Sequence, residues 1–242
     1  MSHTARSLIN CTIEQIKPLT PVVYEITLAP DEPVDFVAGQ YVKVVMSDTD
    51  ARPFSIANAP QRYNGAKPGN HLFLQIGAQP DNPYAWEVLE KLRAQDSVQL
   101  DGPHGNAAYQ PSLRPLLLIA GGTGFSYVYA ILQQALLQDP DRQIELFWGV
   151  RHIDDFYCLD DLNALSEQYS GFRFSPVLEN ATTEWQGLTG WVHTAVMTEI
   201  SDLSGFDVYV AGRFEMAKVV RDDFGARGLP ASQLFGDAYD YL

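Results

Sequence analysis

The chain has 242 residues, of which 46 % are hydrophobic and 19 % charged. This composition is typical of a folded protein with one large domain or two ordinary ones. The 16 Lys and Arg against 30 Asp and Glu give a formal net charge of -14. Because a polyanion repels phosphate backbones and anionic lipid, we expect neither nucleic acid nor a membrane surface as a partner.

The sequence contains no recognisable targeting segment or metal motif. The first ten residues, MSHTARSLIN, lack the apolar core of a signal peptide, and no stretch is apolar for the ~20 residues of a membrane span. Cys11 and Cys158 form no C-x-x-C pair, and the histidines show no metal-ligand spacing. The five histidines are His3, His71, His104, His152 and His193. We therefore expect a cytoplasmic, reduced protein without a metal.

The first half of the chain has the pattern of antiparallel strands. From about Asn10 to Gly105, short apolar runs are separated by Pro, Gly and Asp, as in VVYEITLAP, DFVAGQYVKVVM, RPFSIANAP, HLFLQIGA and DSVQLDGP. Short alternating segments with frequent turn signals predict a small β-barrel. One helix interrupts them, with Asn82 as N-cap and Pro83 in its first turn. Its apolar residues at helical spacing are Ala85, Val88, Leu89 and Leu92.

The pattern changes around AAYQPSLRP, where we expect a boundary between domains of residues 1–108 and 109–242. Beyond it, strand-like runs alternate with helical ones. PLLLIA precedes a helix from near Phe125, IELFWGV precedes one from near Phe156, and FRFSPVL precedes one near Val192 to Ile200. DVYVAG then precedes a helix through MAKVVRDDF. This alternation predicts βαβ units and a parallel, twisted sheet.

Two glycine-rich turns follow predicted strands of the second half. The first is Gly121, Gly122, Thr123 and Gly124, directly before a helix. Such glycines let a ligand approach the backbone, and the free N–H groups of the next helix suit a pyrophosphate. The turn is not the G-x-G-x-x-G fingerprint, and a tight connection without a ligand would have the same glycines.

The second turn, Gly212 to Met216, ends the strand DVYVA. Both turns are expected at the carboxyl ends of parallel strands, where ligands bind if the strand order reverses. Arg213 supplies a positive charge for phosphate or ribose, or forms an ordinary surface ion pair. In the first half, RPFSIAN places Arg52 three positions before Ser55. Taken alone, these two residues fit a barrel surface as well as a site.

Motifs along nearly the whole chain resemble those of a known family. AGQYV, RPFSIAN, LQIG, DGPHGNA, LLLIAGGTGFSY, LFWGVR, YVAGRFEMAKVV and LFGDAYDYL occur in the order found in the ferredoxin–NADP reductase superfamily. GGTGFSY, AGRFEMAK and LFGDA resemble its bacterial NAD(P)H:flavin reductases, including those associated with luciferase. The resemblance implies an antiparallel β-barrel flavin-binding domain followed by an α/β parallel-sheet domain that binds the nicotinamide nucleotide. It also implies hydride transfer from NADH or NADPH to riboflavin, FMN or FAD.

The resemblance also implies roles for individual residues. Ser55 would hydrogen-bond near flavin N5 and Arg52 would face the polar side of the flavin, both as catalytic residues. Tyr239 or Tyr241 would shield the ring. The implied flavin-binding residues are Arg52, Pro53, Phe54, Ser55, Gln75, Ile76, Gly77, Thr123, Ser126 and Tyr239, with the backbone of 75–77 along the ring edge. The implied nucleotide-binding residues are Gly121, Gly122, Thr123, Gly124, Arg151, Gly212, Arg213 and Met216.

Two departures from the wider family are informative. Ala211 and Arg213 stand where plant-type members carry a cysteine and a proline, so no catalytic thiol is implied. Members that keep FAD hold its pyrophosphate at a G-x-x-[ST] helix start, whereas QPDNPYAWEVLEKL has Asp81 there and no Ser or Thr in the first turn. An aspartate repels a diphosphate. We therefore hypothesise that the flavin is held mainly by its ring, binds weakly and leaves after reduction as a substrate.

The segment GVRHIDD bears on whether the protein uses NADH or NADPH. Arg151 and His152 favour the 2′-phosphate of NADPH, whereas Asp154 and Asp155 oppose it. We expect NADH, or both nucleotides, to be used.

Two other functions fit the motifs. One is an electron-transfer flavoprotein with bound flavin that reduces a ferredoxin, an oxygenase or ferric iron. The other is a non-catalytic flavin or nucleotide sensor, against which the presence of Arg52, Ser55 and Thr123 argues. A flavin reductase would instead supply a monooxygenase, a luciferase or ferric iron with reduced flavin.

Overall fold

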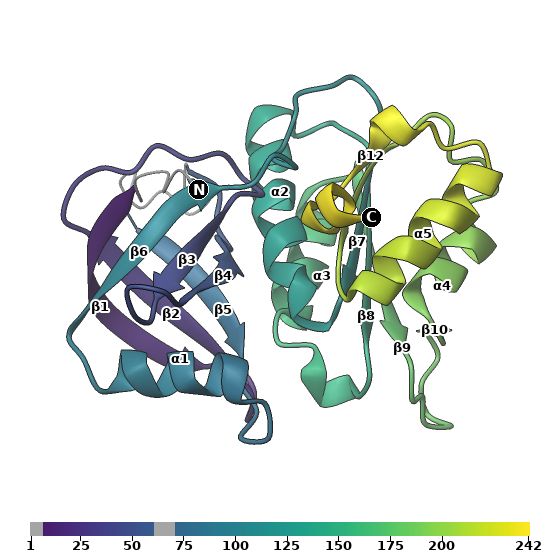
Figure 1. Cartoon of the computed structure of the whole chain (residues 1–242). Coiled ribbons are helices and arrows are strands. Elements are labelled where there is room, and N and C mark those ends of the chain that lie inside the picture. The colour runs from purple at the N-terminus through teal and green to yellow at the C-terminus, as the bar shows by residue number, and fades with distance from the viewer. Residues whose placement is uncertain (1–6, 61–70) are drawn as a thin grey trace. The chain divides into compact units, whose positions relative to one another are not determined.

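The computed structural model describes residues 7–60 and 71–242; His3 lies outside them. The chain divides into two compact units, Met1–Tyr109 and Gln110–Leu242, here called the barrel unit and the α/β unit (Figure 1). The division falls one residue after the expected boundary. The reason lies in the backbone: Tyr109 N–H donates to Ala38 O at 2.8 Å, whereas Gln110 N–H donates to the Tyr209 hydroxyl at 3.0 Å.

The barrel unit is a six-stranded antiparallel sheet of order β4-β3-β6-β1-β2-β5. Its strands are β1 (Leu8–Pro18), β2 (Val23–Pro30), β3 (Tyr41–Val45), β4 (Ala51–Ser55), β5 (Leu72–Gly77) and β6 (Ser97–His104). Among the described residues, the edges β4 and β5 meet through a bridge between Ile56 and Leu74 rather than a full ladder. The predicted antiparallel fold is confirmed as a sheet that curls like a barrel but does not close.

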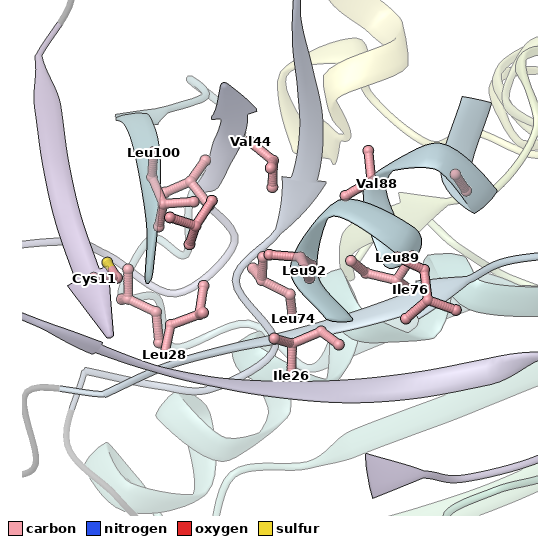
Figure 2. Close-up of a cluster of buried hydrophobic side chains, with 14 of the residues drawn as sticks. Cys11, Ile26, Leu28, Val44, Leu74, Ile76, Val88, Leu89, Leu92 and Leu100 are labelled. Carbon is pink, nitrogen blue, oxygen red and sulfur yellow. The ribbon is translucent and has the colours of Figure 1, made fainter. Parts of the chain in front are cut away.

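Helix α1 (Pro83–Arg93) lies where the sequence predicts it. The Asn82 side chain accepts a hydrogen bond from Tyr84 N–H at 3.2 Å, and Pro83 occupies the first turn. Figure 2 shows Leu89 and Leu92 near Leu74 and Ile76, within one buried hydrophobic cluster. All four apolar residues predicted for the helix are buried in that cluster: Ala85, Val88, Leu89 and Leu92.

The α/β unit is a six-stranded parallel sheet of order β10-β9-β8-β7-β11-β12, with α2 and α3 on one face and α4 and α5 on the other (Figure 1). Its strands are β7 (Leu116–Gly121), β8 (Ile144–Val150), β9 (Phe172–Leu178), β10 (Leu188–Thr189), β11 (Asp207–Ala211) and β12 (Leu234–Phe235). Its helices are α2 (Phe125–Gln138), α3 (Leu159–Gln168), α4 (Val192–Glu199) and α5 (Phe214–Ala226). The predicted parallel sheet is confirmed.

One predicted helix start differs from the structure. The sequence places a helix from near Phe156, but α3 begins at Leu159 after a short 3₁₀ turn, Ile153–Asp155. Phe156 is instead buried, with its ring edge-on to Trp148 at a centroid distance of 5.2 Å. Among the described residues, no helix is long and apolar enough to cross a membrane.

The glycine turns after β7 and β11 lie in close contact. β7 and β11 are neighbours, and the strand order reverses between them. A Cβ atom on Gly124 would lie 2.6 Å from both C and O of Ala211, closer than real Cβ contacts come. Gly122 differs, because a Cβ atom there would meet no other atom within 4 Å. Its φ of +55° is instead a conformation that residues with a side chain rarely adopt. The first turn therefore needs glycine at these two positions for separate reasons.

This contact predicts a difference between two alanine variants. Gly122→Ala should cost about 1–2 kcal/mol, because only the left-handed conformation opposes it. Gly124→Ala should cost about 3 kcal/mol or more, because the end of β11 must move. Thermal unfolding measures this, at about 2–4 °C per kcal/mol for a domain of 150–250 residues and somewhat more for a smaller one. Equal losses of unfolding free energy in the two variants would show that the contact between Gly124 and Ala211 leaves room for a Cβ atom.

Candidate functional site

Ser55 belongs to a row of side chains across three strands of the barrel unit. Tyr41 of β3 lies opposite Ser55 of β4 on one side and opposite His104 of β6 on the other. Residues directly opposite in a sheet share a face. Val42 and Val44, which alternate with Tyr41, are buried in the core. The row Ser55–Tyr41–His104 therefore lies on the outer face of the sheet.

The side chains of this row are partly accessible. No described residue hydrogen-bonds to the Ser55 hydroxyl, which is half-buried. The Tyr41 and His104 rings are 5.6 Å apart, and His104 Nε2 lies 3.2 Å from Oδ1 of the buried Asp101. The two atoms are close but do not have the geometry of a hydrogen bond, and neither has another hydrogen-bond partner among the described residues. The sequence analysis did not assign Tyr41 or His104 to the site, because the strand register that aligns them with Ser55 is not visible in the sequence.

Arg52 points away from this row. It lies opposite Val44 and so on the core-facing side of β4, from which it reaches α1. Its guanidinium donates to carboxylate oxygens of Asp50 at 2.8 Å and Glu87 at 2.7 Å, and to Tyr84 O at 2.5 Å. Hydrogen bonds to the two carboxylates raise the pKa of Arg52 above its usual range. The alternation of β4 thus separates two residues that the sequence analysis grouped together.

The other predicted flavin contacts of the barrel unit differ in exposure. Pro53 is exposed on the same face as Ser55, whereas Phe54 packs against the core. Gln75 is buried, with Nε2 3.4 Å from Glu25 Oε2, and Ile76 is part of the core. β5 is an edge strand paired with β2 on one side. The structure is therefore compatible with a backbone contact at Gln75–Gly77 but not with one through the Ile76 side chain.

In the α/β unit, Met216 fills the space between the two glycine turns. A Cβ atom would lie 2.8 Å from Met216 Sδ at Gly121 and 2.6 Å from it at Gly212. These glycines and Met216 thus pack against one another at the carboxyl ends of β7 and β11. The Met216 sulfur thus packs between the two turns, and its predicted contact with the nucleotide stays a prediction.

The first turn leads into α2 through a 3₁₀ turn, Gly122–Gly124, whose Gly122 and Thr123 carbonyls accept from the Phe125 N–H. α2 has no side-chain cap at Gly124 and no acidic residue in its first turn, so the positive end of its dipole is not neutralised by a carboxylate there. Thr123 is exposed, and no described residue hydrogen-bonds to its hydroxyl. Ser126 is buried, and its hydroxyl donates to Thr123 O at 3.1 Å. Ser126 therefore fixes the turn rather than presenting its hydroxyl to a ligand.

Trp148 of β8 also holds this turn. Its Nε1–H donates to Gly122 O at 2.9 Å, and its ring stacks on Phe125 at a centroid distance of 3.9 Å. Both side chains are fully buried. The sequence analysis missed this role, since LFWGVR predicts a strand but not the partner of its indole N–H.

Two exposed arginines flank the turn of β7. Arg151 follows β8 and Arg213 follows β11, the strands on either side of β7. Neither guanidinium forms an ion pair with another described residue. Asp155 accepts a hydrogen bond from His152 N–H at 3.0 Å and so closes its own turn, whereas Asp154 is exposed. This edge of the sheet thus carries positive charge that would favour an anionic ligand.

The C-terminal residues carry two tyrosines with different environments. The Tyr239 hydroxyl donates to Ala217 O of α5 at 3.1 Å, and burial raises the pKa of Tyr239 above its usual range. Tyr241 is 77 % exposed, with its ring edge-on to Phe214. Burial, with Asp240 nearby, raises the pKa of Asp237 to about 6. Tyr239 is thus anchored to its own unit, and its contact with flavin stays a prediction.

No group of three His, Cys, Asp or Glu side chains suited to a metal occurs within residues 7–60 and 71–242. Cys11 and Cys158 are free and buried, and burial raises the pKa of Cys11 to about 12. Neither thiol is therefore poised as a nucleophile.

Known proteins resemble both the α/β unit alone and the whole chain. Residues 118–222 match the model of the oxidoreductase NAD-binding domain family. A cytochrome P450 reductase of Amycolatopsis has a similar structure, with a TM-score of 0.84, 26 % identity and coverage of 96 % of this chain and 70 % of that one. A ferredoxin NADP⁺ reductase of Neisseria gonorrhoeae, solved with FAD and NADP, shares the fold at a TM-score of 0.74, 21 % identity and 93 % coverage of both chains.

Two relatives match over almost their full length. The NAD(P)H-flavin reductase of Aliivibrio fischeri is 41 % identical, over 97 % of this chain and 99 % of its own. That of Vibrio harveyi is 42 % identical over the same shares. The chain therefore belongs to the NAD(P)H-flavin reductase family.

Proposed function

We propose that the protein is an NAD(P)H:flavin oxidoreductase that transfers hydride from NADH or NADPH to riboflavin, FMN or FAD bound as a substrate. The full-length likeness to two NAD(P)H-flavin reductases carries this proposal. The geometry of each unit supports the roles of individual residues.

In the barrel unit, the proposed flavin contact is the outer face around Ser55. Its hydroxyl has no hydrogen-bond partner among the described residues, so it is available to flavin N5. Pro53 shares this face, and the backbone of Gln75–Gly77 is the proposed contact along the ring edge. Arg52 and Phe54 act as positioning residues, since they fix β4 to α1 and to the core.

In the α/β unit, the proposed nucleotide contact is the edge where the strand order reverses. The positive end of the α2 dipole suits a pyrophosphate, and Thr123 lies exposed in the turn before it. Arg151 and Arg213 supply positive charge on either side. Because Asp155 is engaged within its own turn, both NADH and NADPH are proposed substrates, with Asp154 favouring NADH.

The flavin supplies the chemistry, and the protein supplies position. Hydride transfer requires nicotinamide C4 to lie roughly 3–3.5 Å from flavin N5. Ser55 would orient the acceptor atom, and the glycine turns would hold the donor nucleotide. The remaining task of the protein is to exclude competing reactions.

Reduced flavin reacts quickly with oxygen, so the product must reach a user. A flavin-dependent monooxygenase or a luciferase is the proposed user, reached by diffusion. The cytoplasm, where reduced nicotinamide nucleotides are available and thiols such as Cys11 and Cys158 stay reduced, is the proposed location.

The decisive experiment titrates dialysed, colourless protein with free flavin while NADH or NADPH consumption is followed at 340 nm. We expect saturable turnover with riboflavin, FMN and FAD, and no turnover without added flavin. Protein that stays yellow and needs only a one-electron acceptor would support the alternative, an electron-transfer flavoprotein.

Ser55→Ala tests the flavin contact. Removal of a hydrogen bond of about 1–2 kcal/mol to the reacting ring should lower kcat/KM for riboflavin about ten-fold, with little change in KM for NADH. Ser97→Ala, which alters an exposed serine of β6, is the matched control. An equal kcat/KM in Ser55→Ala and wild type would show that Ser55 takes no part in the reaction.

A further inference from the structure

Met216, the third residue of α5, places its sulfur between the glycine turns after β7 and β11. A Cβ atom built on Gly121 would lie 2.8 Å from Met216 Sδ, and one built on Gly212 would lie 2.6 Å from it. The next atoms at both positions are Met216 Cε and the backbone of the other glycine, at 3.2–3.8 Å. The thioether therefore fills the space that two absent side chains leave.

The Met216 side chain is also open to solvent in part. It is half-buried, and the residues before it, Arg213, Phe214 and Glu215, are all exposed. On its other side it packs against the buried cluster that contains Val210. A small solute can therefore reach this side chain, although protein packs against it on two sides.

The cysteines compete poorly with Met216 for a mild oxidant. Cys11 and Cys158 are only 1 % and 8 % exposed, and burial raises the pKa of Cys11 to about 12. Peroxides attack accessible thiolates, so burial makes both cysteines poor targets. Oxidation of a thioether needs no deprotonation. The methionines of the described residues, Met46, Met197 and Met216, are all half-buried, which makes a methionine the expected target.

We propose that Met216 is a modification site at which hydrogen peroxide forms methionine sulfoxide, and that the sulfoxide weakens nucleotide binding. The source of the peroxide rests on the proposed function, in which released reduced flavin reacts with O₂ to give oxidised flavin and hydrogen peroxide. One peroxide oxygen bonds to Sδ while the O–O bond breaks, and the second oxygen leaves as water with the proton of the first. The sulfur loses two electrons, and the peroxide gains them.

The sulfoxide does not suit the space that the thioether occupies. Its S–O bond is polar and requires hydrogen bonds or water, whereas the sulfur lies against the backbones of two glycines. We expect the oxidised side chain to turn toward solvent, which leaves a void between the turns. Since both turns are proposed nucleotide contacts, the loss of this packing lowers the affinity for NADH. The enzyme would then slow when no user consumes its reduced flavin.

The test treats the purified protein with millimolar hydrogen peroxide, which catalase then removes. Peptide mass spectrometry gives the fraction of sulfoxide at each methionine. The Kd of NADH is measured from the fluorescence of the nucleotide, without flavin, and Tm is measured in parallel. We expect oxidation of Met216 to raise the Kd of NADH about five- to ten-fold, because a less ordered site binds more weakly. Tm should fall by about 3–6 °C.

Met216→Leu conserves volume but cannot be oxidised. After peroxide treatment, its Kd of NADH and its Tm should match those of the same variant before treatment. Met197→Leu removes another half-buried methionine of the same unit, so it is the matched control and should stay as sensitive as wild type. In wild type, methionine sulfoxide reductases specific for the two sulfoxide epimers should restore both values, and this readout needs no variant to fold.

A second incubation supplies NADH, riboflavin and air instead of added peroxide. Met216 sulfoxide should accumulate during turnover, and catalase should prevent its formation. This arm tests the source of the oxidant, whereas added peroxide tests the site.

A Met216 that stays unoxidised in millimolar peroxide would overturn the proposal, whether or not Met46 and Met197 react. So would an unchanged NADH Kd and Tm after full oxidation of Met216, an equal loss in Met216→Leu, or turnover in air without Met216 sulfoxide. If the incubation with NADH and riboflavin gives no turnover, the proposed function is wrong. Added peroxide then still decides the role of Met216, through Tm and the Kd of NADH.

Discussion

The absence of room for a side chain at Gly124 is the constraint on which the α/β unit depends. Because a Cβ atom there would lie 2.6 Å from the backbone of Ala211, the turns after β7 and β11 can come together only around glycine. That approach places the start of α2 and Arg213 at one edge of the sheet, where the strand order reverses. The packing of Met216 against Gly121 and Gly212 and the Trp148 hydrogen bond to Gly122 then fix the turn. These contacts hold the backbone of the turn in one conformation.

In the barrel unit, two residues of β4 have separate roles: Ser55 faces the proposed flavin ring, and Arg52 attaches the strand to α1. Alternation along β4 turns Ser55 to the outer face and Arg52 toward α1. A residue on the outer face is available to a flat ring, whereas Arg52 already has two carboxylates as partners. Such an arrangement suits a flavin that arrives, is reduced and leaves.

Much of the fold could be predicted from the sequence because local rules agree with the tertiary structure. Asn82, Pro83 and the apolar spacing of α1 indicated a helix that the structure contains, with the expected face buried. The parallel sheet followed from strands alternating with helices. The two-residue strands β10 and β12 were not predicted, since an alternating pattern cannot appear in two residues.

The parts of the site that the sequence did not indicate depend on contacts between distant segments. The row of Ser55, Tyr41 and His104 exists only through strand register. The partners of Arg52 include Glu87, 35 residues away. Motif resemblance grouped Ser126 with the ligand contacts, although its hydroxyl is used within the turn. In each case the sequence showed the residue type but not where its side chain points or what it contacts.

The most direct test of the central claim, that the protein positions one nicotinamide face over a flavin, follows the fate of a label. Riboflavin is reduced with NADH deuterated at C4 in either the R or the S position, and the recovered NAD⁺ is analysed by mass spectrometry. Positioned hydride transfer predicts NAD⁺ without deuterium from one isomer and with full retention from the other. Mixed retention from both isomers would contradict the account.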